Sequence, residues 1–288
     1  MRGVRPHPGA EGRPVTGAEH HHDTGPDAGP EYDDSVEEAA GDDTPVETAA
    51  TRGRSLFAVA GGDLISPLTL VLVRHGVTDM TITHALSGSG EVGPSLNASG
   101  RVQAAKAADA VHRIGRTTWD RVPHVSRVLA SPMTRTQETG AAIGRRLGVH
   151  VETEPRVREI HFGEWEGLTG DDIAERFGDA IHRWRFGEIA APGGESIPDV
   201  GARFDAFLVD AAAEHASLCA EEDVARAWAV ASHAVAIKSA VGVSLSMPAT
   251  HWGHIWPQPA SLTLLQLRVR TDGTIAERHL LCLGAPTS

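Results

Sequence analysis

The apolar residues of this chain fall into short, nearly continuous runs, separated by longer stretches in which small and apolar residues recur at helical spacing. Residues 68–73 read LTLVLV, which is typical of a strand buried on both faces of a parallel sheet. Comparable runs predict further strands at residues 125–130, 150–152 and 228–231. The intervening stretches predict helices at residues 97–114, 135–147, 197–215 and 234–243, and one or two short helices over 171–186.

The last part of the chain follows a different pattern. Residues 261–269 and 275–282 are two β-rich runs joined at Thr271-Asp272-Gly273, and Asp-Gly is typical of a hairpin turn. Strands that alternate with helices, followed by one such hairpin, predict an α/β fold. We expect a three-layer α/β/α sandwich whose mostly parallel sheet has an antiparallel edge.

The first 66 residues have another composition. They are rich in Gly, Pro, Asp, Glu and Thr, show no sustained periodicity, and hold 13 acidic residues against 5 arginines. Such a segment buries too little apolar surface to offset the entropy of ordering it. We therefore expect a disordered acidic N-terminal tail over residues 1–66 and a single catalytic domain over residues 67–285.

Charge and cysteine content narrow the classes of partner. The whole chain has a net charge of −12, but residues 1–66 account for −8 of it, so the folded part is nearly balanced at −4. This balance does not favour a nucleic-acid partner. Two distant cysteines, Cys219 and Cys282, make no disulfide framework. No apolar leader and no run of about 18 apolar residues are seen, so we expect a cytoplasmic protein with no membrane partner.

Three short motifs carry the candidate chemistry, and each follows a predicted strand. Arg74-His75 follows residues 68–73, Ser131 and Arg135 follow residues 125–130, and His233 follows residues 228–231. Because the carboxyl ends of parallel strands meet at one edge of a sheet, these motifs should bring two guanidinium groups and two imidazoles together.

That set of side chains suits phosphoryl transfer. The transition state spreads negative charge over phosphoryl oxygens, and the planar guanidinium of arginine can hold two such oxygens at once. A neutral imidazole is a competent nucleophile near neutral pH and can carry the phosphoryl group covalently. An acid that protonates the leaving alkoxide is the one part that these three motifs do not supply.

Five motifs in order give the sequence a resemblance to a known family. RHGVTD, SPMTRTQET, REIHFGEWEG, PGGES and SHAVAIK together resemble the histidine phosphatase superfamily, in its phosphoglycerate-mutase-like branch, over roughly residues 68–283. The nearest likeness is to its small-molecule phosphatases, such as α-ribazole phosphatase and broad-specificity acid phosphatases. The resemblance implies a phosphomonoesterase that acts on a small phosphate ester and needs no cofactor.

The resemblance also assigns roles to single residues. It implies that His75 is the nucleophile, that Glu159 is the general acid, and that phosphate is held by Arg74, Arg135 and His233. Thr81 stands where many members have asparagine, and Ala234 replaces a commoner glycine. The expected substrate-binding residues are Arg74, Arg135, His233, Ala234, Thr81, Ser87 and Gly88. No cluster with metal-ligand spacing is found in the folded part, so no metal site is expected.

Several alternatives stay open at this point. Glu164 or Glu166 could assist or replace Glu159 as the acid, and Lys238 could line the substrate site. A cofactor-dependent phosphoglycerate mutase uses the same core residues and is the first alternative function; an inactive binding module is the second. The sequence indicates neither the physiological substrate nor the oligomeric state.

Overall fold

The computed structural model describes residues 63–287, in which a six-stranded sheet is ordered β3-β2-β4-β1-β5-β6. Four strands run parallel: β1 (Leu68–Arg74), β2 (Val125–Ala130), β3 (Val151–Thr153) and β4 (Arg226–Ser232). The hairpin strands β5 (Leu262–Val269) and β6 (Ile275–Ala285) add to β1 as an antiparallel edge. The predicted sheet, with its antiparallel edge, is confirmed.

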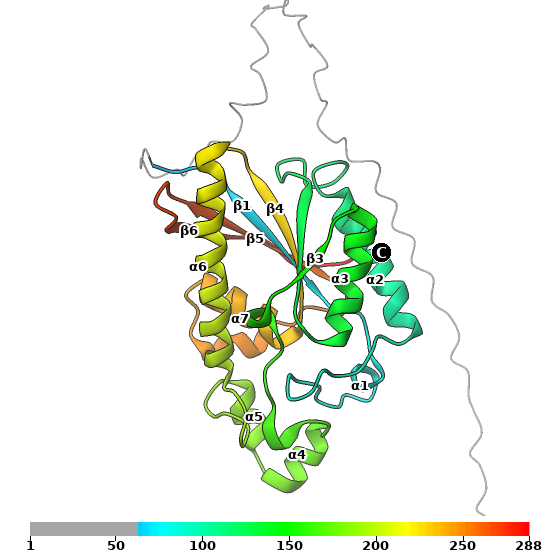
Figure 1. Cartoon of the computed structure of the whole chain (residues 1–288). Coiled ribbons are helices and arrows are strands. Elements are labelled where there is room, and N and C mark those ends of the chain that lie inside the picture. The colour runs from blue at the N-terminus through cyan, green and yellow to red at the C-terminus, as the bar shows by residue number, and fades with distance from the viewer. Residues whose placement is uncertain (1–62, 288) are drawn as a thin grey trace, which may run out of the picture. The chain divides into compact units, whose positions relative to one another are not determined.

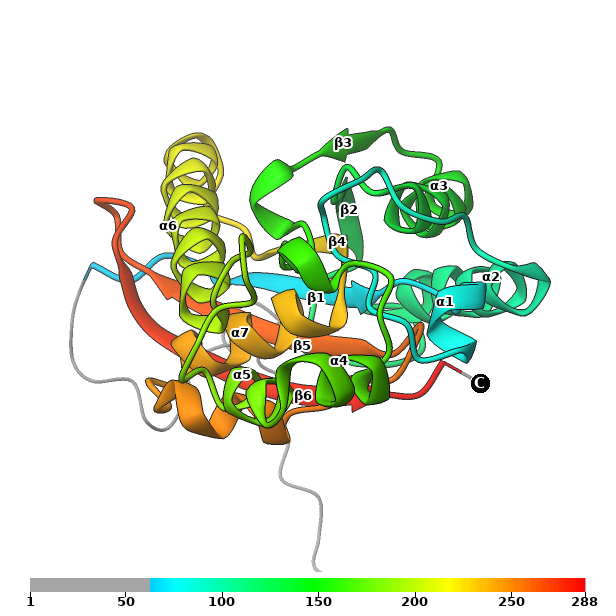
Figure 2. The same cartoon turned by 90° about the horizontal axis from the view of Figure 1, so that it is seen from below.

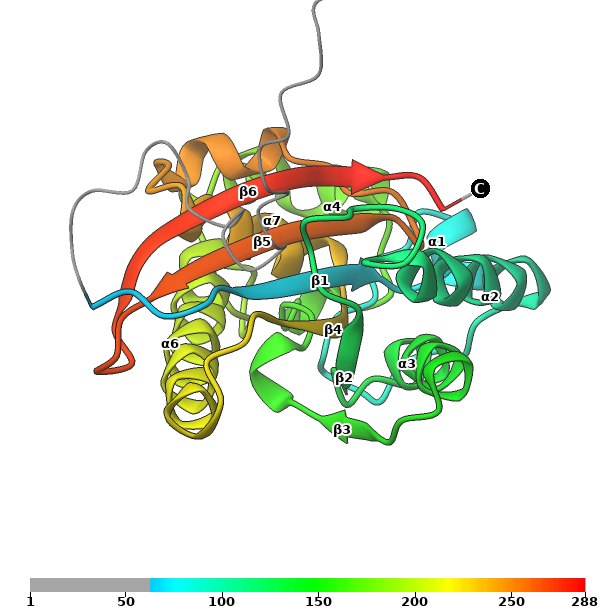
Figure 3. The same cartoon turned by 90° about the horizontal axis from the view of Figure 1, so that it is seen from above.

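Helices cover both faces of this sheet, so the fold has the three predicted layers (Figure 3). Alternate residues of β1 serve the two faces: Val71 and Val73 pack in one apolar cluster, whereas Leu70 and Leu72 pack in the other. The first cluster includes α2 (Ala98–Arg113) and α3 (Thr134–Leu147); the second includes α6 (Ile197–Glu221) and α7 (Ala234–Ser244). The fully buried pattern of β1 follows from this two-sided packing.

Shorter elements gather at the carboxyl ends of the parallel strands (Figures 1 and 2). The stretch expected to hold one or two short helices folds as α4 (Gly170–Phe177) and α5 (Ala180–Arg185). A four-residue helix that was not predicted, α1 (Asp79–Ile82), follows the first motif. Three 3₁₀ turns lie at Pro155–Val157, Gly163–Trp165 and Ala249–His254.

Side-chain caps explain where several helices begin. Ser196 and Asp199 form a reciprocal capping box at the start of α6, and Thr169 and Asp172 form another at the start of α4. Asn97 accepts a hydrogen bond from the N–H group of Gly100 and so caps α2. These polar residues satisfy first-turn N–H groups that would otherwise have no acceptor.

The proposed tail lies outside the described residues, apart from residues 63–66. Of these, Ile65 donates its N–H group to Val269 of β5 (3.0 Å), and Ser66 donates its own to the carboxylate of Asp223 (2.8 Å). The expected domain boundary at residues 66/67 stays a prediction. Among the helices of residues 63–287, none has the length and apolar character needed to cross a membrane.

Candidate active site

The register between β1 and β4 places the two candidate histidines side by side. Arg74 pairs with Ser232 at the carboxyl ends of these strands, and the N–H group of His75 donates to the carbonyl of Ser232 (3.0 Å). His75 and His233 are the next residues along each chain, and their rings meet edge to face with centroids 5.2 Å apart. We expected separate strands to bring these motifs together. For the two histidines, the strands are the neighbours β1 and β4.

His75 is held in one tautomer. Its Nδ1 atom lies 2.7 Å from the carbonyl oxygen of Gly76, which can only accept, so Nδ1 carries the proton and Nε2 keeps the lone pair of the neutral ring. Burial, followed by the charges of Arg135 and Arg74, lowers the pKa of His75 well below its usual value. The ring therefore stays unprotonated at Nε2, as a nucleophile requires.

The loop of His75 is packed closely on the start of α2. A β-carbon on Gly76 would collide with the carbonyl oxygen of Gly100, and a β-carbon on Gly100 would collide with the backbone of Val77. Only two glycines allow this approach of two backbones. The contact fixes the position of the segment that follows His75.

His233 is fully buried and has one ring nitrogen without a partner. Its Nε2 lies 2.7 Å from the hydroxyl of Ser131, which follows β2, whereas its Nδ1 has no hydrogen-bond partner in the described part of the chain. Burial is the main cause that lowers the pKa of His233 well below its usual value, followed by the charge of Arg135. The second ring is thus a neutral group with one free nitrogen.

The two arginines are buried, and each uses only part of its guanidinium. Arg74 donates to the carbonyl of Pro257 (2.8 Å), and Arg135 donates to the carbonyls of Ser87 (2.9 Å) and Gly88 (3.1 Å). Nε of Arg74, and Nε and Nη1 of Arg135, have no partner within residues 63–287. Burial lowers the pKa of Arg135 to about 10. Buried donors without acceptors are costly, so this group is suited to receive an anion.

Glu159 lies at the start of the helix that follows His233. Its carboxylate accepts hydrogen bonds from the N–H groups of Val235 (3.3 Å) and Ala236 (3.2 Å), in the first turn of α7. The side chain is buried, and its charge acts on both Arg74 and Arg135. The structure thus brings together all five residues expected in the catalytic group.

A half-buried ion pair that contacts the backbone of Glu159 was missed by the sequence analysis. Arg203 of α6 makes five hydrogen bonds: two to the carboxylate of Glu195 and three to the backbone carbonyls of Arg156, Arg158 and Glu159. Glu195 belongs to the PGGES motif and also accepts from Arg158 (2.9 Å). One signal was present in the sequence, because Arg203 lies at helical spacing on the apolar stripe of α6.

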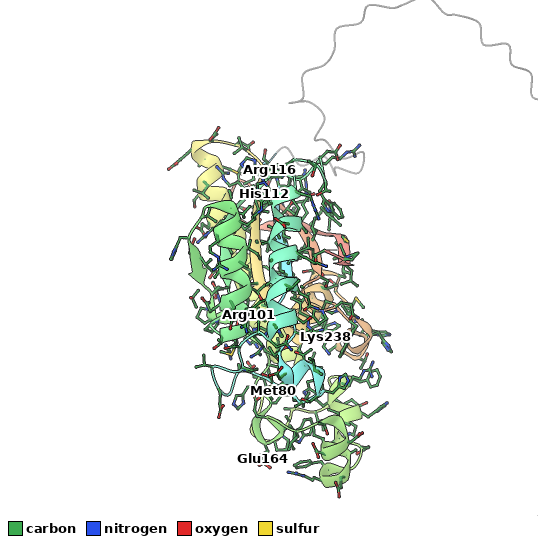
Figure 4. The ribbon with its side chains drawn as sticks, turned by 90° about the vertical axis from the view of Figure 1, so that its right-hand side faces the viewer. Met80, Arg101, His112, Arg116, Glu164 and Lys238 are labelled. Atoms are coloured by element: carbon green, nitrogen blue, oxygen red, sulfur yellow. The ribbon has the colours of Figure 1, made fainter. Side chains whose placement is uncertain are left out.

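The alternative acids have different surroundings. Glu166 accepts from the N–H groups of Gly88 (2.8 Å), Gly90 (3.2 Å) and Phe162 (3.1 Å), so its carboxylate is engaged in holding the loop that contacts Arg135. Glu164 is exposed, and it lies at the lower end of the view in Figure 4. Neither carboxylate makes a hydrogen bond with the histidines or arginines of the site among the described residues.

The other expected substrate-binding residues contact the catalytic group through their backbone or not at all. Ser87 and Gly88 meet Arg135 through their carbonyl oxygens, and Ala234 is the first residue of α7. The hydroxyl of Thr81 contacts Thr78 in the capping box of α1. Contact of these four residues with substrate stays a prediction.

Candidate metal ligands do not gather in the described residues: no group of three or more His, Cys, Asp or Glu side chains is placed to hold an ion there.

Known proteins of similar sequence include phosphatases. Glucosyl-3-phosphoglycerate phosphatase of Mycobacterium tuberculosis is 29% identical to this chain over 184 residues, which is 64% of this chain and 78% of the relative. A solved structure of mycobacterial glucosyl-3-phosphoglycerate phosphatase in complex with VO3 is 27% identical, has a TM-score of 0.62, and is covered over 99% of its length by 75% of this chain.

A second solved structure supports the same fold. It is described as a mycobacterial hydrolase, is 26% identical, has a TM-score of 0.67, and aligns 77% of this chain with 92% of its own. These likenesses confirm the predicted phosphoglycerate-mutase-like fold and the prediction of a phosphoric monoester hydrolase. The family model of the histidine phosphatase superfamily (branch 1) matches residues 70–277, and the chain belongs to that superfamily.

Proposed function

We propose that this enzyme hydrolyses a small phosphate ester through a phosphohistidine on His75, with Glu159 as the general acid. The observation that carries the proposal is a set of nitrogens on Arg74, Arg135 and His233 that have no partner within residues 63–287. They accompany the buried imidazole of His75, whose free lone pair is on Nε2. Together they offer an anion several buried donors and a nucleophile in one place.

The reaction has two balanced steps. In the first, Nε2 of His75 forms a bond to phosphorus, the bond between phosphorus and the ester oxygen breaks, and Glu159 gives that oxygen a proton. In the second, water attacks the phosphohistidine, Glu159 takes a proton from the water, and inorganic phosphate leaves as the N–P bond breaks.

The other basic groups stabilise the transferring phosphoryl group. Arg74 and Arg135 donate to its equatorial oxygens, where negative charge spreads in the transition state. When Ser131 donates its hydroxyl proton to Nε2 of His233, the Nδ1 atom keeps a proton for a third oxygen. These groups are held by the fold before the substrate arrives, so little reorganisation opposes the reaction.

Hydrolysis is favoured over the mutase alternative. A mutase must keep water away from its phosphohistidine while the intermediate turns round. Here the chain between Trp165 and Gly193 holds only the two short helices α4 and α5. The mycobacterial phosphatase relative favours a small phosphorylated metabolite as substrate. Retention of the nucleophile, both arginines, the second histidine and the acid argues against an inactive binding module.

Three further properties belong to this proposal. A metal-independent mechanism is supported by Arg74 and Arg135, which bring the positive charge that a metal ion supplies elsewhere. A cytoplasmic location is supported by Cys219 and Cys282, which are both free thiols. A small phosphate ester, rather than a nucleic acid or a membrane, is the partner that the small balanced charge of the folded part favours.

Trapping the intermediate tests the mechanism. The enzyme is mixed with a ³²P-labelled phosphate ester and quenched rapidly without acid, and the label is located by peptide mapping. We expect base-stable, acid-labile label on His75, and no label and almost no turnover with His75→Ala. Label on a serine, or an active His75→Ala variant, would contradict the proposal.

A further inference from the structure

A glutamine of α2 is hydrogen-bonded to the peptide group that holds the ring of His75. The carbonyl oxygen of Gly76 accepts from Nδ1 of His75 (2.7 Å). The N–H group of the same peptide belongs to Val77 and donates to Oε1 of Gln103 (2.9 Å). The peptide between Gly76 and Val77 thus has a side-chain partner at each end, the imidazole on its oxygen and the glutamine on its nitrogen.

The start of α2 brings Gln103 to this peptide. Gly100 packs so closely on Gly76 and Val77 that a β-carbon on either glycine would collide with the opposite backbone. Gln103 lies three residues after Gly100, on the same side of the helix. The carbonyl of Val77 is held as well, because it accepts from the N–H group of Asn97 (3.2 Å), the N-cap of α2. Helix α2 therefore sets the plane of the Gly76–Val77 peptide.

Hydrogen bonds that share one peptide group strengthen each other. An acceptor on the N–H group polarises the amide and makes its carbonyl oxygen a better acceptor. Here the chain runs from Oε1 of Gln103 through the peptide to the Nδ1 proton of His75. Without the glutamine, the N–H group of Val77 would lose its partner, and the carbonyl oxygen would hold the imidazole less well. The tautomer protonated at Nε2 would then gain population, and it has no lone pair with which to attack phosphorus.

A second side chain contacts this segment, but on another peptide. The N–H group of Gly76 donates to the hydroxyl of Thr139 at 3.4 Å, and that hydroxyl donates to the carbonyl of Arg135 (2.8 Å). This peptide joins His75 to Gly76, and its carbonyl is not the one that accepts from Nδ1. Of the two side chains, only Gln103 contacts the peptide that fixes the tautomer.

We infer that Gln103 is a positioning residue for the nucleophile: it holds the Gly76–Val77 peptide so that the proton of His75 stays on Nδ1 and the lone pair on Nε2. This inference rests on the proposed function, in which Nε2 of His75 attacks phosphorus. Gln103 acts through a backbone peptide and is not itself a catalytic residue.

The tautomer of His75 tests the inference directly. ¹⁵N-histidine spectra at pH 7 distinguish a protonated from an unprotonated ring nitrogen, and His75→Asn assigns the signals. We expect the wild-type ring to carry its proton on Nδ1. In Gln103→Leu, and in Gln103→Met of similar length, the ratio of the Nε2-protonated to the Nδ1-protonated form should rise by about 3- to 10-fold, the range of one net hydrogen bond. Gln103→Glu keeps an oxygen acceptor and should match the wild type.

The rate of attack should follow the tautomer. With enzyme in excess over p-nitrophenyl phosphate, release of p-nitrophenolate reports the first step alone, in which His75 attacks. At saturating enzyme this step should be about 3- to 10-fold slower in Gln103→Leu. The enzyme concentration that gives half the maximal rate should change by less than about twofold, because Arg74 and Arg135 still bind the phosphoryl group. Gln103→Glu should restore the wild-type rate.

Gln266→Leu is the matched control. Gln266 is also half-buried, and its amide donates to the hydroxyl of Thr69 (3.3 Å), near the end of β1 that is remote from His75. This variant should change neither the spectrum nor the rate. A folded Gln103→Leu variant with the wild-type tautomer or the wild-type rate would overturn the inference, and so would a Gln103→Glu variant that behaves like Gln103→Leu. An active His75→Ala variant would instead contradict the proposed function.

Discussion

The rings of His75 and His233 meet edge to face, 5.2 Å between centroids, because each directly follows one of two paired residues in adjacent parallel strands. Both rings are buried beside Arg135, which disfavours a second positive charge on either. Burial is the main cause that keeps both rings neutral. The proposed mechanism needs a neutral His75 to attack and a neutral His233 to accept from Ser131.

The protonation of His75 should be visible in spectra of the free enzyme. The pKa of His75 is lowered, so the neutral form persists to a lower pH than the usual value of about 6.5 allows. ¹⁵N-histidine spectra should show the Nδ1-protonated neutral ring of His75 still dominant at pH 5.5. His75→Asn assigns the signal. An imidazolium signal for His75 at pH 6 would disprove this prediction.

The acid should matter most when the leaving group is poor. Glu159→Gln should slow hydrolysis of an alkyl phosphate by about 10²-fold or more, because the alkoxide then leaves without a proton. With p-nitrophenyl phosphate, whose phenolate leaves readily, the loss should be clearly smaller. Glu164→Gln is the matched control, since Glu164 is exposed and should change neither rate. Equal losses on both substrates would make Glu159 structural.

Arg203 should act through Glu159 as a positioning residue. Its guanidinium makes five hydrogen bonds, including those to the carbonyl oxygen of Glu159 (2.9 Å) and the carboxylate of Glu195, whereas a lysine has only three N–H groups. Arg203→Lys should therefore lower kcat for alkyl phosphates by about tenfold, and lower it less for p-nitrophenyl phosphate. Arg183→Lys is the control, because Arg183 forms an exposed ion pair with Glu188. A uniform loss that parallels a lower melting temperature would show a purely structural role.

Lys238 should make the stability of the protein depend on alkaline pH. Its pKa is about 8 in the folded chain and about 10.5 in the unfolded chain, so the unfolded state binds more protons between these values. The free energy of unfolding should therefore rise with pH across that window, by on the order of 3 kcal/mol at most. Urea titrations at pH 7.5 and pH 10 should show a smaller rise for Lys238→Met. The same rise in both proteins would contradict the lowered pKa.

Most of the fold was readable from the sequence because its main elements have strong local patterns. The strand at residues 68–73 is apolar on both faces, and Asp272-Gly273 marks the hairpin between β5 and β6. The helix expected over 197–215 continues to Glu221, because its apolar stripe includes Cys219. The helix α1 has only four residues and none of them is buried, so no apolar pattern in the sequence predicts it.

The sequence predicted only those residues of the site that belong to recognisable motifs. Arg74, His75 and Arg135 could be placed because strand ends set their positions. The groups that hold these side chains could not be predicted. Arg74 donates to the carbonyl of Pro257, and Arg135 donates to the carbonyls of Ser87 and Gly88. A backbone carbonyl is present at every position of a chain and leaves no mark in the sequence. Only the folded structure shows which carbonyl is used.

The carboxylate of Glu166 sets a limit for anyone who wishes to redesign this enzyme. It joins the segment that carries Glu159, the proposed acid, to the loop at Gly88, and the same loop holds Arg135. A side chain at Gly88 would collide with Glu166, so the loop and the carboxylate fit only as a pair. Transplanting a loop from another phosphatase to alter selectivity would therefore have to carry Gly88 with it, or else move Glu166 as well.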